Sequence, residues 1–328
     1  MKNTLDFIII GAQKSATTTL FEYLRLHPEL HLPPHKELPF FSDEATRARG
    51  WDDYISNAFT FADPHAKWGT ATPHYMVGGL LKEPNPQAGD GTYDELTVPL
   101  RIQERLPAVR LIAILRDPAE RAQSHHRMAV MNQIDKRTFA QAIDELLQPD
   151  ALEQARREPS ENTGYIVWGE YGRILAAYFD VFPREQILVL FTKDLENDPE
   201  RLLGRIYEFV GVRDFIPNNI GTRYRIGSTE RRLSWLTYYS RVSPWALRRA
   251  LVRNLTARKL WHTVPKTVRG QVDGMLVRLA HKIDLWNRRI ETEVPVPDSA
   301  TLERLRAHYT QDTQKLAELI GANPPWQS

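Results

Sequence analysis

Residues 6–20 read Asp-Phe-Ile-Ile-Ile-Gly-Ala-Gln-Lys-Ser-Ala-Thr-Thr-Thr-Leu, and this stretch decides the fold class. The apolar run that ends at Gly11 is typical of a buried parallel strand. From residue 17 to residue 27, apolar side chains recur at helical spacing until Pro28 stops the pattern. A buried strand, a short loop and a helix in this order begin the alternation that α/β proteins show.

The alternation of strands and helices continues along the chain. Two further apolar runs, at residues 110–115 and 186–191, predict buried strands. Apolar side chains at helical spacing predict further helices at residues 118–131, 170–182, 199–210, 234–258 and 299–320. Strands that alternate with helices imply a mostly parallel sheet covered on both faces, so the expected fold class is α/β.

Length and composition fit a globular protein. The chain has 328 residues, of which 42% are hydrophobic and 26% charged, a balance that excludes a largely disordered, collagen-like or coiled-coil chain. It has no cysteine, which excludes disulfides, thiolate nucleophiles and cysteine-ligated metal centres. The apolar run near the N-terminus is too short for a signal peptide, and no apolar window of ~18 residues exists to span a membrane. We therefore expect a soluble, cytoplasmic protein.

Basic residues are concentrated between residues 223 and 289. This segment has 16 Lys and Arg residues against 3 Asp and Glu, a local net charge of +13, whereas the whole chain has +2. The asymmetry predicts an acidic partner, such as an anionic substrate, a membrane surface or a nucleic acid. The alternative is that the charges line solvated helix faces and that the interspersed Trp and Tyr residues fill a helical core.

The loop between the first strand and the first helix has the features of an anion-binding site. Backbone N–H groups at a helix N-terminus carry partial positive charge, and Lys14 adds a full charge. Hydroxyl groups add further donors at Ser15, Thr17, Thr18 and Thr19. The loop is not a Walker A sequence, which has a glycine directly before its lysine. Here Lys14 comes three residues after Gly11, and the residue directly before it is not a glycine. The alternative is a threonine-rich helix start with an exposed lysine.

A second polar motif follows the strand at residues 110–115. Arg116 ends this strand, where ligands collect in open α/β sheets, and Ser124 lies two turns along the next helix. A guanidinium and a hydroxyl so placed could hold a second phosphate. The alternative is an Arg116–Asp117 pair that only caps the helix.

Together the two motifs resemble those of sulfotransferases that use 3′-phosphoadenosine 5′-phosphosulfate (PAPS). Residues 11–20 resemble the family's 5′-phosphosulfate loop, and Arg-Asp-Pro-x-x-Arg-x-x-Ser at residues 116–124 resembles its 3′-phosphate motif. The chain is most similar to the heparan-sulfate-type carbohydrate sulfotransferases and their bacterial relatives. Further fragments agree with this branch, at residues 36–41, 70–75, 169–171, 182–183 and 321–326.

The resemblance implies a domain organisation. We expect one sulfotransferase domain over residues 1–328, with a P-loop-like central parallel sheet flanked by helices. Its core would comprise about residues 5–215 and 298–326, and a basic, aromatic-rich helical insertion would occupy about residues 216–297. One departure concerns Ala16, which stands where the family loop usually has glycine. If this position requires a positive φ, the alanine is strained.

The resemblance also implies an activity, the transfer of a sulfuryl group from PAPS to a hydroxyl or an amine of a glycan, glycolipid or related acceptor. No metal is expected, and the desulfated product would be 3′-phosphoadenosine 5′-phosphate (PAP). The residues implied to bind PAPS are Lys14, Ser15, Ala16, Thr17, Thr18, Thr19, Arg116, Ser124, Tyr171, Arg223 and Arg225. Lys36 and His74 are expected on the acceptor side.

Two residues are implied in catalysis. Lys14 would stabilise charge on the leaving group, and Glu37 would be the base that deprotonates the acceptor. Apolar neighbours of Glu37 could raise its pKa toward neutrality, which suits a base. The alternative base is His125 or His126, since other sulfotransferase branches use a histidine.

Two other functions remain open from the sequence. One is a P-loop phosphotransferase, and the other is a non-catalytic protein of the same fold that binds anions or a membrane surface. The expected partner is a glycan or lipid-linked acceptor, with membrane-surface contact through residues 223–289. No nucleic acid is expected, and the location is cytoplasmic with peripheral contact at the membrane.

Overall fold

The chain divides into two compact units in a computed structural model, residues 1–225 with 297–328 and residues 226–296. The structure describes residues 2–34, 36–59, 63–77, 95–222, 229–231, 288–290 and 299–327. Within the second unit it describes two short antiparallel strands, β6 (Thr229–Arg231) and β7 (Arg288–Ile290). The helix predicted at residues 234–258 lies outside the described residues.

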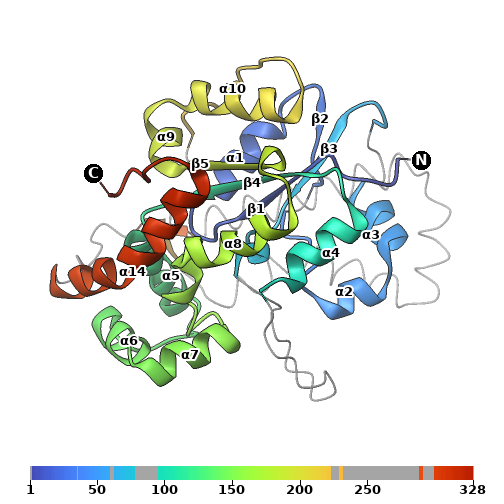
Figure 1. Ribbon diagram of the computed structural model, residues 1–328. Coiled ribbons are helices and arrows are strands. Elements are labelled where there is room, and N and C mark those ends of the chain that lie inside the picture. Colours follow the sequence, from blue (N-terminus) through green and yellow to red (C-terminus); the bar gives the residue numbers. More distant parts are fainter. Residues whose placement is uncertain are drawn as a thin grey trace, which may run out of the picture. The chain divides into compact units, whose positions relative to one another are not determined.

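The first unit is built on a five-stranded parallel sheet with the order β2-β3-β1-β4-β5 (Figure 1). Its strands are β1 (Phe7–Gly11), β2 (Leu30–His31), β3 (Lys67–Ala71), β4 (Arg110–Leu115) and β5 (Ile187–Phe191). The predicted α/β fold with a central parallel sheet is therefore confirmed. Strands β2 and β3 were not predicted.

Helices surround this sheet. The α-helices are α1 (Thr17–Leu24), α2 (Glu44–Ala48), α3 (Trp51–Ala58), α4 (Thr97–Arg105), α5 (Pro118–Met131), α6 (Phe139–Leu146), α7 (Pro149–Arg157), α8 (Tyr171–Val181), α9 (Thr192–Asn197), α10 (Pro199–Val210) and α14 (Ser299–Ile320). Short 3₁₀ turns are η1 (Pro73–Met76), η2 (Val167–Gly169) and η3 (Arg184–Gln186). The predicted helices at 118–131, 170–182, 199–210 and 299–320 match α5, α8, α10 and α14.

Both faces of the sheet are buried because side chains along each strand point alternately to opposite sides. In β1, Ile8 and Ile10 belong to one apolar cluster, and Phe7 and Ile9 belong to another. Helices α3, α4 and α8 contribute to the first cluster, and α1 and α10 cover the second face (Figure 1). This two-sided burial explains why β1 is an uninterrupted apolar run in the sequence.

The strand order brings the loops of interest to one place. From β1 the chain runs to β2 and β3 on one side and then returns to β4 on the other side. The loops that follow β1 and β4 therefore leave the same edge of the sheet in different directions. Such a switch in strand order opens a crevice at the carboxyl ends of the strands, where α/β proteins bind ligands.

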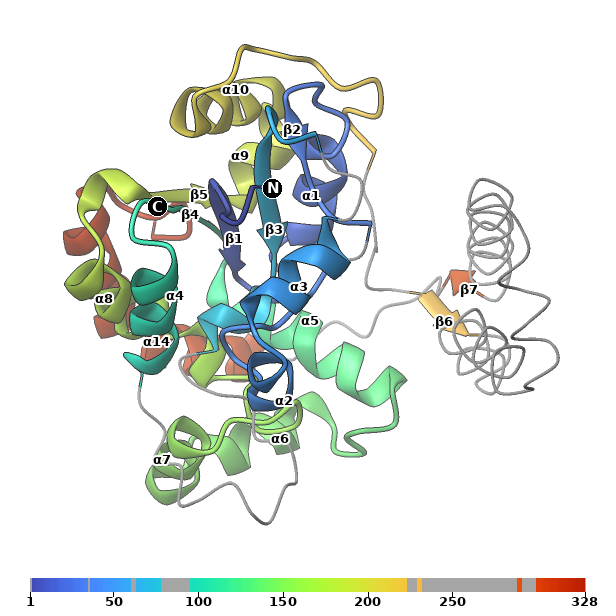
Figure 2. The ribbon, with the colours of Figure 1, turned by 90° about the vertical axis from the view of Figure 1, so that its right-hand side faces the viewer.

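The C-terminal helix α14 lies beside α8 (Figure 2). The backbone N–H groups of Gly172 and Arg173 donate to the Asp312 carboxylate at 2.8 and 2.7 Å, so α14 supplies the cap for the start of α8. Farther along, Trp326 packs against Tyr171 and Phe191. The end of the described chain thus belongs to the core of the first unit.

The first unit extends past the predicted boundary at residue 215. The Tyr23 hydroxyl donates to the Thr222 carbonyl at 3.0 Å, and Asn219 donates from its side chain to the Glu22 carbonyl at 3.3 Å. Residues 216–222 therefore pack on α1. The helical content of the predicted insertion stays a prediction, because most of it lies outside the described residues.

Candidate active site

The loop between β1 and α1 has a backbone suited to anions. Lys14 and Ala16 both adopt positive φ, 68° and 58°, and Ala16 is the residue that precedes the helix. Ala16 has no side chain that could accept a hydrogen bond from the first-turn N–H groups of α1. The Ser15 hydroxyl is fully buried and has no hydrogen-bond partner among the described residues. This arrangement leaves donors available to a bound anion.

The start of this loop requires glycine. A Cβ atom placed on Gly11 would lie 2.6 Å from the Cβ and Sδ atoms of Met76 in η1. Ala12 continues the register by donating its N–H to the Ile114 carbonyl of β4 at 2.8 Å. The loop is thus fitted closely between η1 on one side and β4 on the other.

Glu37 lies at the carboxyl end of β3, the strand next to β1. Its backbone N–H donates to the Ala71 carbonyl at 2.9 Å, while Thr72 donates to the Ile9 carbonyl of β1 at 2.9 Å. Lys36 donates to the Glu37 carboxylate at 2.6 Å. Glu37 and the β1–α1 loop therefore sit at neighbouring strand ends.

The apolar neighbours of Glu37 do not bury it, contrary to the sequence-based expectation. Its side chain is 39% exposed, whereas Phe40 and Phe41 turn inward and pack against Trp51. The Lys36 side chain is only 10% exposed and keeps its ammonium against the carboxylate. The Glu37 carboxylate thus lies against the charged Lys36 side chain and not in an apolar environment.

Arg116 follows β4 at the same edge of the sheet. Its guanidinium donates through Nε and Nη2 to Glu120 at 2.9 and 2.8 Å, and its side chain is 36% exposed. Asp117 caps α5 by accepting from the N–H groups of Ala119 and Glu120. Ser124 is partly exposed on α5. The cap therefore comes from Asp117, and Arg116 lies outside it in an exposed ion pair that contributes little stability.

The two alternative bases are buried. His125 is 0% exposed, and its ring stacks on Trp168 with centroids 4.8 Å apart. Burial lowers the pKa of His125 to about 4, although its hydrogen bond to Glu161 acts in the opposite direction. His126 is 8% exposed, bonds to the Arg137 carbonyl at 3.0 Å, and has a pKa lowered by burial. Both rings are therefore enclosed by neighbouring side chains.

A carboxylate that the sequence analysis did not select lies between these elements. Glu161 accepts from the Gln13 side chain at 3.1 Å and bonds His125 Nε2 at 3.0 Å. Its other neighbour is His74 of η1, whose Nε2 lies 3.4 Å from the carboxylate. Burial raises the pKa of Glu161, but the hydrogen bonds of His125 and His74 outweigh it and hold the pKa well below its usual range.

Other predicted site residues occupy different positions. Thr17 and Thr19 are buried and Thr18 is partly exposed on the first turn of α1. Tyr171 is 1% exposed, and burial raises the pKa of its hydroxyl, which faces Ser15 and the Arg116 backbone. Tyr171 is therefore a buried residue that supports the β1–α1 loop. Arg223 and Arg225 lie outside the described residues.

Within the described part of the chain, His, Cys, Asp and Glu side chains form no group of three that could hold a metal ion. Of the helices in that same part, none combines the length and apolar character needed to cross a bilayer.

Comparison with known proteins agrees with this geometry. A family model described as a sulfotransferase domain matches residues 4–220. The chain is 28% identical over 213 residues to bifunctional heparan sulfate N-deacetylase/N-sulfotransferase 1 of Mus musculus, a match that covers 62% of this chain and 22% of that protein. It is 24% identical over 212 residues to heparan sulfate glucosamine 3-O-sulfotransferase 3B1 of Homo sapiens, covering 64% of this chain and 46% of that protein.

A solved structure shares the fold. The sulfotransferase from Alicyclobacillus acidocaldarius superposes with a TM-score of 0.62 at 19% identity, covering 99% of both chains. The curated relatives above are longer proteins, and this chain matches less than half of each.

Proposed function

The chain belongs to the sulfotransferase domain family, and on this premise we propose that it transfers a sulfuryl group from PAPS to a hydroxyl group of a glycan or glycolipid. The observation that supports this most directly is the β1–α1 loop. The Ser15 hydroxyl is buried with no hydrogen-bond partner among the described residues, and Ala16 gives the start of α1 no side-chain cap. A phosphate group is the ligand that such a helix N-terminus favours.

The residues at this edge of the sheet fit the two ends of PAPS. Lys14, Ser15 and the N–H groups of residues 16–19 would hold the 5′-phosphosulfate. Arg116 and Ser124 would hold the 3′-phosphate, for which Arg116 must leave or share its exposed ion pair with Glu120. That exchange costs little free energy, because an exposed ion pair contributes about 0–1 kcal/mol to stability. Arg223 and Arg225 are proposed as further contacts.

Chemistry at this site would depend on positioned charge. Bound PAPS would supply a sulfuryl group on a phosphate leaving group. The Lys14 ammonium would stabilise the negative charge that grows on the leaving oxygen. Glu37, at the adjacent strand end, would accept the proton of the acceptor hydroxyl, and Lys36 and His74 would contact the acceptor. No metal is needed for these roles.

The burial of the histidines favours Glu37 as the base. An acceptor hydroxyl must come within about 3 Å of the group that takes its proton. The Glu37 carboxylate is 39% exposed, whereas His125 is fully buried and His126 is 8% exposed. Glu37 has the most exposed side chain of the three candidates, which supports its proposed role as the base.

The acceptor class is proposed from the relatives. The two curated proteins named above act, by their names, on heparan sulfate, which makes a glycan the first acceptor to test. One is an N-sulfotransferase and the other a 3-O-sulfotransferase, so both an amine and a hydroxyl belong in the test. The basic segment 223–289 would attract an anionic glycan or a lipid-linked acceptor at a membrane surface.

Calorimetry tests the cofactor, and a transfer assay tests the reaction. We expect PAP to bind more tightly than 5′-AMP, because only PAP carries the 3′-phosphate that Arg116 would hold. Arg116→Ala should weaken PAP binding at least tenfold, since a charge-assisted hydrogen bond contributes ~1.5–3 kcal/mol. Equal affinity for PAP and 5′-AMP would rule out the PAPS site. Labelled PAPS incubated with glycans and glycolipids, with products identified by mass, would identify the acceptor.

A further inference from the structure

Glu161 connects three elements that carry the proposed site. Its carboxylate accepts from Gln13 in the β1–α1 loop at 3.1 and 3.3 Å and from His125 of α5 at 3.0 Å. It lies 3.4 Å from His74 Nε2 in η1, on the acceptor side. Gln13 is 148 residues away in the sequence, so this contact exists only through the fold.

The hydrogen-bonding pattern fixes the direction of each contact. The Nδ1 atom of His125 lies 3.5 Å from the Arg121 guanidinium, which can only donate. Nδ1 is therefore the acceptor nitrogen of a neutral ring, and Nε2–H donates to Glu161. Gln13 presents its Nε2 to the same carboxylate, because the flipped amide would bring its oxygen against a negative charge. Glu161 thus sets the orientation of the Gln13 side chain.

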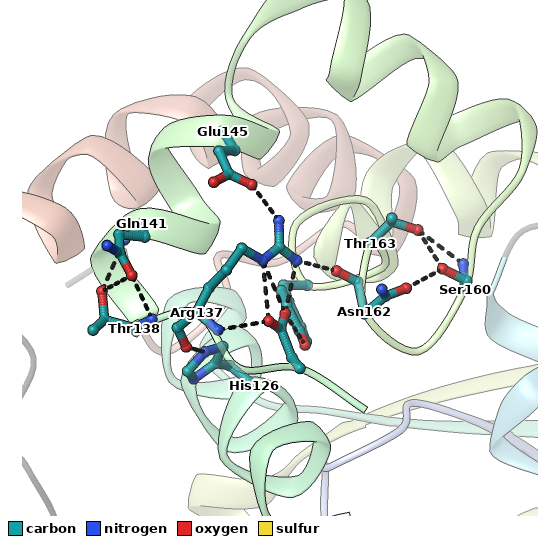
Figure 3. Close-up of polar contacts among 10 residues, drawn as sticks. His126, Arg137, Thr138, Gln141, Glu145, Ser160, Asn162 and Thr163 are labelled. Carbon is teal, nitrogen blue, oxygen red and sulfur yellow. Dashed lines mark hydrogen bonds and ion pairs between the residues drawn. The ribbon is translucent and has the colours of Figure 1, made fainter. Parts of the chain in front are cut away.

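The chain on both sides of Glu161 is held in place (Figure 3). Ser160 donates through its N–H to the Thr163 hydroxyl at 3.0 Å, and its own hydroxyl donates to the Asn162 side chain at 2.7 Å. Arg137 donates to the Asn162 carbonyl at 2.7 Å and also binds Glu145 (Figure 3). Hydrogen bonds on either side therefore keep the Glu161 backbone from moving away from the loop.

Arg137 is itself held by the Asp135 carboxylate. Asp135 accepts from Arg137 Nη2 at 2.7 Å and from the Tyr165 hydroxyl at 2.9 Å. The pKa of Asp135 is lowered, because hydrogen bonds from Arg137 and Tyr165 outweigh the effect of burial, which raises it. The support of Glu161 therefore extends from the turn after α5 to the segment before η2.

The charge of Glu161 decides which role it can have. An ionised carboxylate repels the phosphates and the sulfuryl group of PAPS, so Glu161 is not a ligand of the donor. With a pKa held below its usual range, it is also a weak proton acceptor. Its carboxylate instead accepts hydrogen bonds from the loop and from α5, and it lies beside His74 of η1.

We propose that Glu161 is a positioning residue: by holding the Gln13 side chain, it keeps the β1–α1 loop in the conformation that presents Lys14. Lys14 directly follows Gln13 and has φ of 68°, a conformation that is unfavourable for an L-residue and that the surroundings must enforce. The hydrogen bond from Gln13 to Glu161 holds the outer side of the loop in this conformation. This inference rests on the proposed function only in naming PAPS as the ligand that the loop binds.

A double-mutant cycle tests the coupling through PAP affinity, measured by calorimetry. Glu161→Ala and Gln13→Ala should each weaken PAP binding about tenfold, because each removes the same charge-assisted contact. The double variant should be no weaker than either single variant. Glu161→Gln keeps the size but offers one oxygen to several donors, so its loss should be smaller. Glu153→Gln, in an exposed ion pair on α7, should bind PAP like the wild type.

Hydrogen exchange of the ligand-free protein gives a readout that needs no cofactor. In Glu161→Ala and Glu161→Gln, peptides covering residues 11–20 should exchange several-fold faster than in the wild type, while β4 and β5 keep their protection. Unchanged exchange in residues 11–20, or additive losses of PAP affinity in the double variant, would overturn the proposal. Wild-type protein that fails to bind PAP would refute the PAPS site, and the exchange result would still decide the role of Glu161.

Discussion

Lys14 and Ala16 in the β1–α1 loop both have positive φ. Both residues carry a Cβ atom in a conformation that favours glycine. Gln133 and Glu37 share the feature, and Glu37 is the proposed base. Two of the residues with proposed chemical roles, Lys14 and Glu37, are therefore held in unfavourable backbone conformations, as is common at functional sites.

Lys14→Ala should nearly abolish sulfuryl transfer and leave the fold intact. The ammonium is expected to act on charge that develops in the transition state, and loss of one such donor typically costs about 10²–10³-fold in rate. The measurement is turnover of labelled PAPS with a thermal unfolding curve for each variant. Lys193→Ala, on the exposed face of α9, is the matched control. Unchanged turnover in Lys14→Ala would remove the loop from the chemistry.

Glu37→Gln should lower acceptor-dependent turnover by about 10²-fold or more, because an amide cannot accept the proton. PAP affinity should stay near the wild-type value, since Glu37 is proposed to contact the acceptor and not PAPS. Glu104→Gln, exposed on α4, is the control. A near-normal rate for Glu37→Gln together with a collapse for His125→Ala or His126→Ala would reassign the base.

Ala16→Gly should stabilise the protein. The alanine has φ of 58°, which costs about 1–2 kcal/mol and which glycine adopts freely. Glycine gives back part of this gain through the larger entropy of the unfolded chain, about 0.4–1 kcal/mol. A net gain of up to ~1 kcal/mol should appear in urea unfolding. A lower unfolding midpoint would show that contacts of the Ala16 methyl group with the core outweigh the strain.

At the scale of elements, the sequence predicted those with a strong apolar pattern. Strands β1 and β4 are buried on both faces, and the edge strand β5 is partly buried. All three strands are continuous apolar runs in the sequence. Strand β3 reads Lys-Trp-Gly-Thr-Ala and lacks that pattern. Its Gly69 is required by packing, because a Cβ there would lie 2.1 Å from the Phe7 ring of β1. The residues of β3 are thus explained by packing against β1, and the sequence of β3 alone does not reveal that neighbour.

The sequence likewise predicted some residues of the candidate site and missed others. Lys14, Glu37 and Arg116 follow strand ends or lie in motifs, so local patterns and a family resemblance were enough to select them. Glu161 lies in a polar run with no motif, and its partners are 36 and 148 residues away. Only the folded chain shows that these groups meet.

A buried ionic cluster joins α7, α8 and α14. Glu170 has a side chain only 3% exposed and binds Arg156, Arg173 and His308. Burial raises the pKa of Glu170, but hydrogen bonds from His308 and Arg156 and the charges of the arginines lower it to about 2. Because the pKa in the folded state lies below the usual 4.5, Glu170 stabilises the fold above about pH 4.5, and this contribution is lost as the pH falls toward 2.

Glu170→Gln should therefore destabilise the protein by about 1.5–3 kcal/mol at pH 7, since it removes charge-assisted hydrogen bonds to a buried carboxylate. Urea unfolding of wild type and variant from pH 7 to pH 3 is the measurement. The difference in unfolding free energy should shrink as the pH falls through 4.5, because the wild-type carboxylate then begins to lose its advantage. A constant difference over this range would show that packing, not charge, makes the contribution.

At the scale of the whole molecule, the chain consists of a core unit and a second unit inserted into it. The core unit is formed by residues on both sides of the insertion, and its last helix, α14, packs on α8. The two described strands of the second unit pair with each other, with Arg231 opposite Arg288. The insertion therefore begins and ends at neighbouring points.

Replacing residues 232–287 by Asn-Gly should leave the core unit folded. Positions 231 and 288 are register partners, and Asn-Gly forms the tight turn that joins two such antiparallel strands. The expected result is a cooperative unfolding transition and PAP binding within about threefold of the wild type, with acceptor turnover reduced by loss of the basic segment. Circular dichroism and calorimetry measure the first two. Failure to fold would show that the core unit needs the insertion.

The cap on α8 also orders events during synthesis. Gly172 and Asp312 are 140 residues apart, and a ribosome adds about 5–20 residues per second, so on the order of ten seconds separate their emergence. During that interval the nascent chain already carries the β1–α1 loop and Tyr171 behind it, yet lacks the carboxylate that completes α8. Until α14 emerges, the side of α8 that α14 covers stays open to a chaperone that recognises apolar helix faces. The β1–α1 loop therefore gains the support of a capped α8 only after α14 has been made.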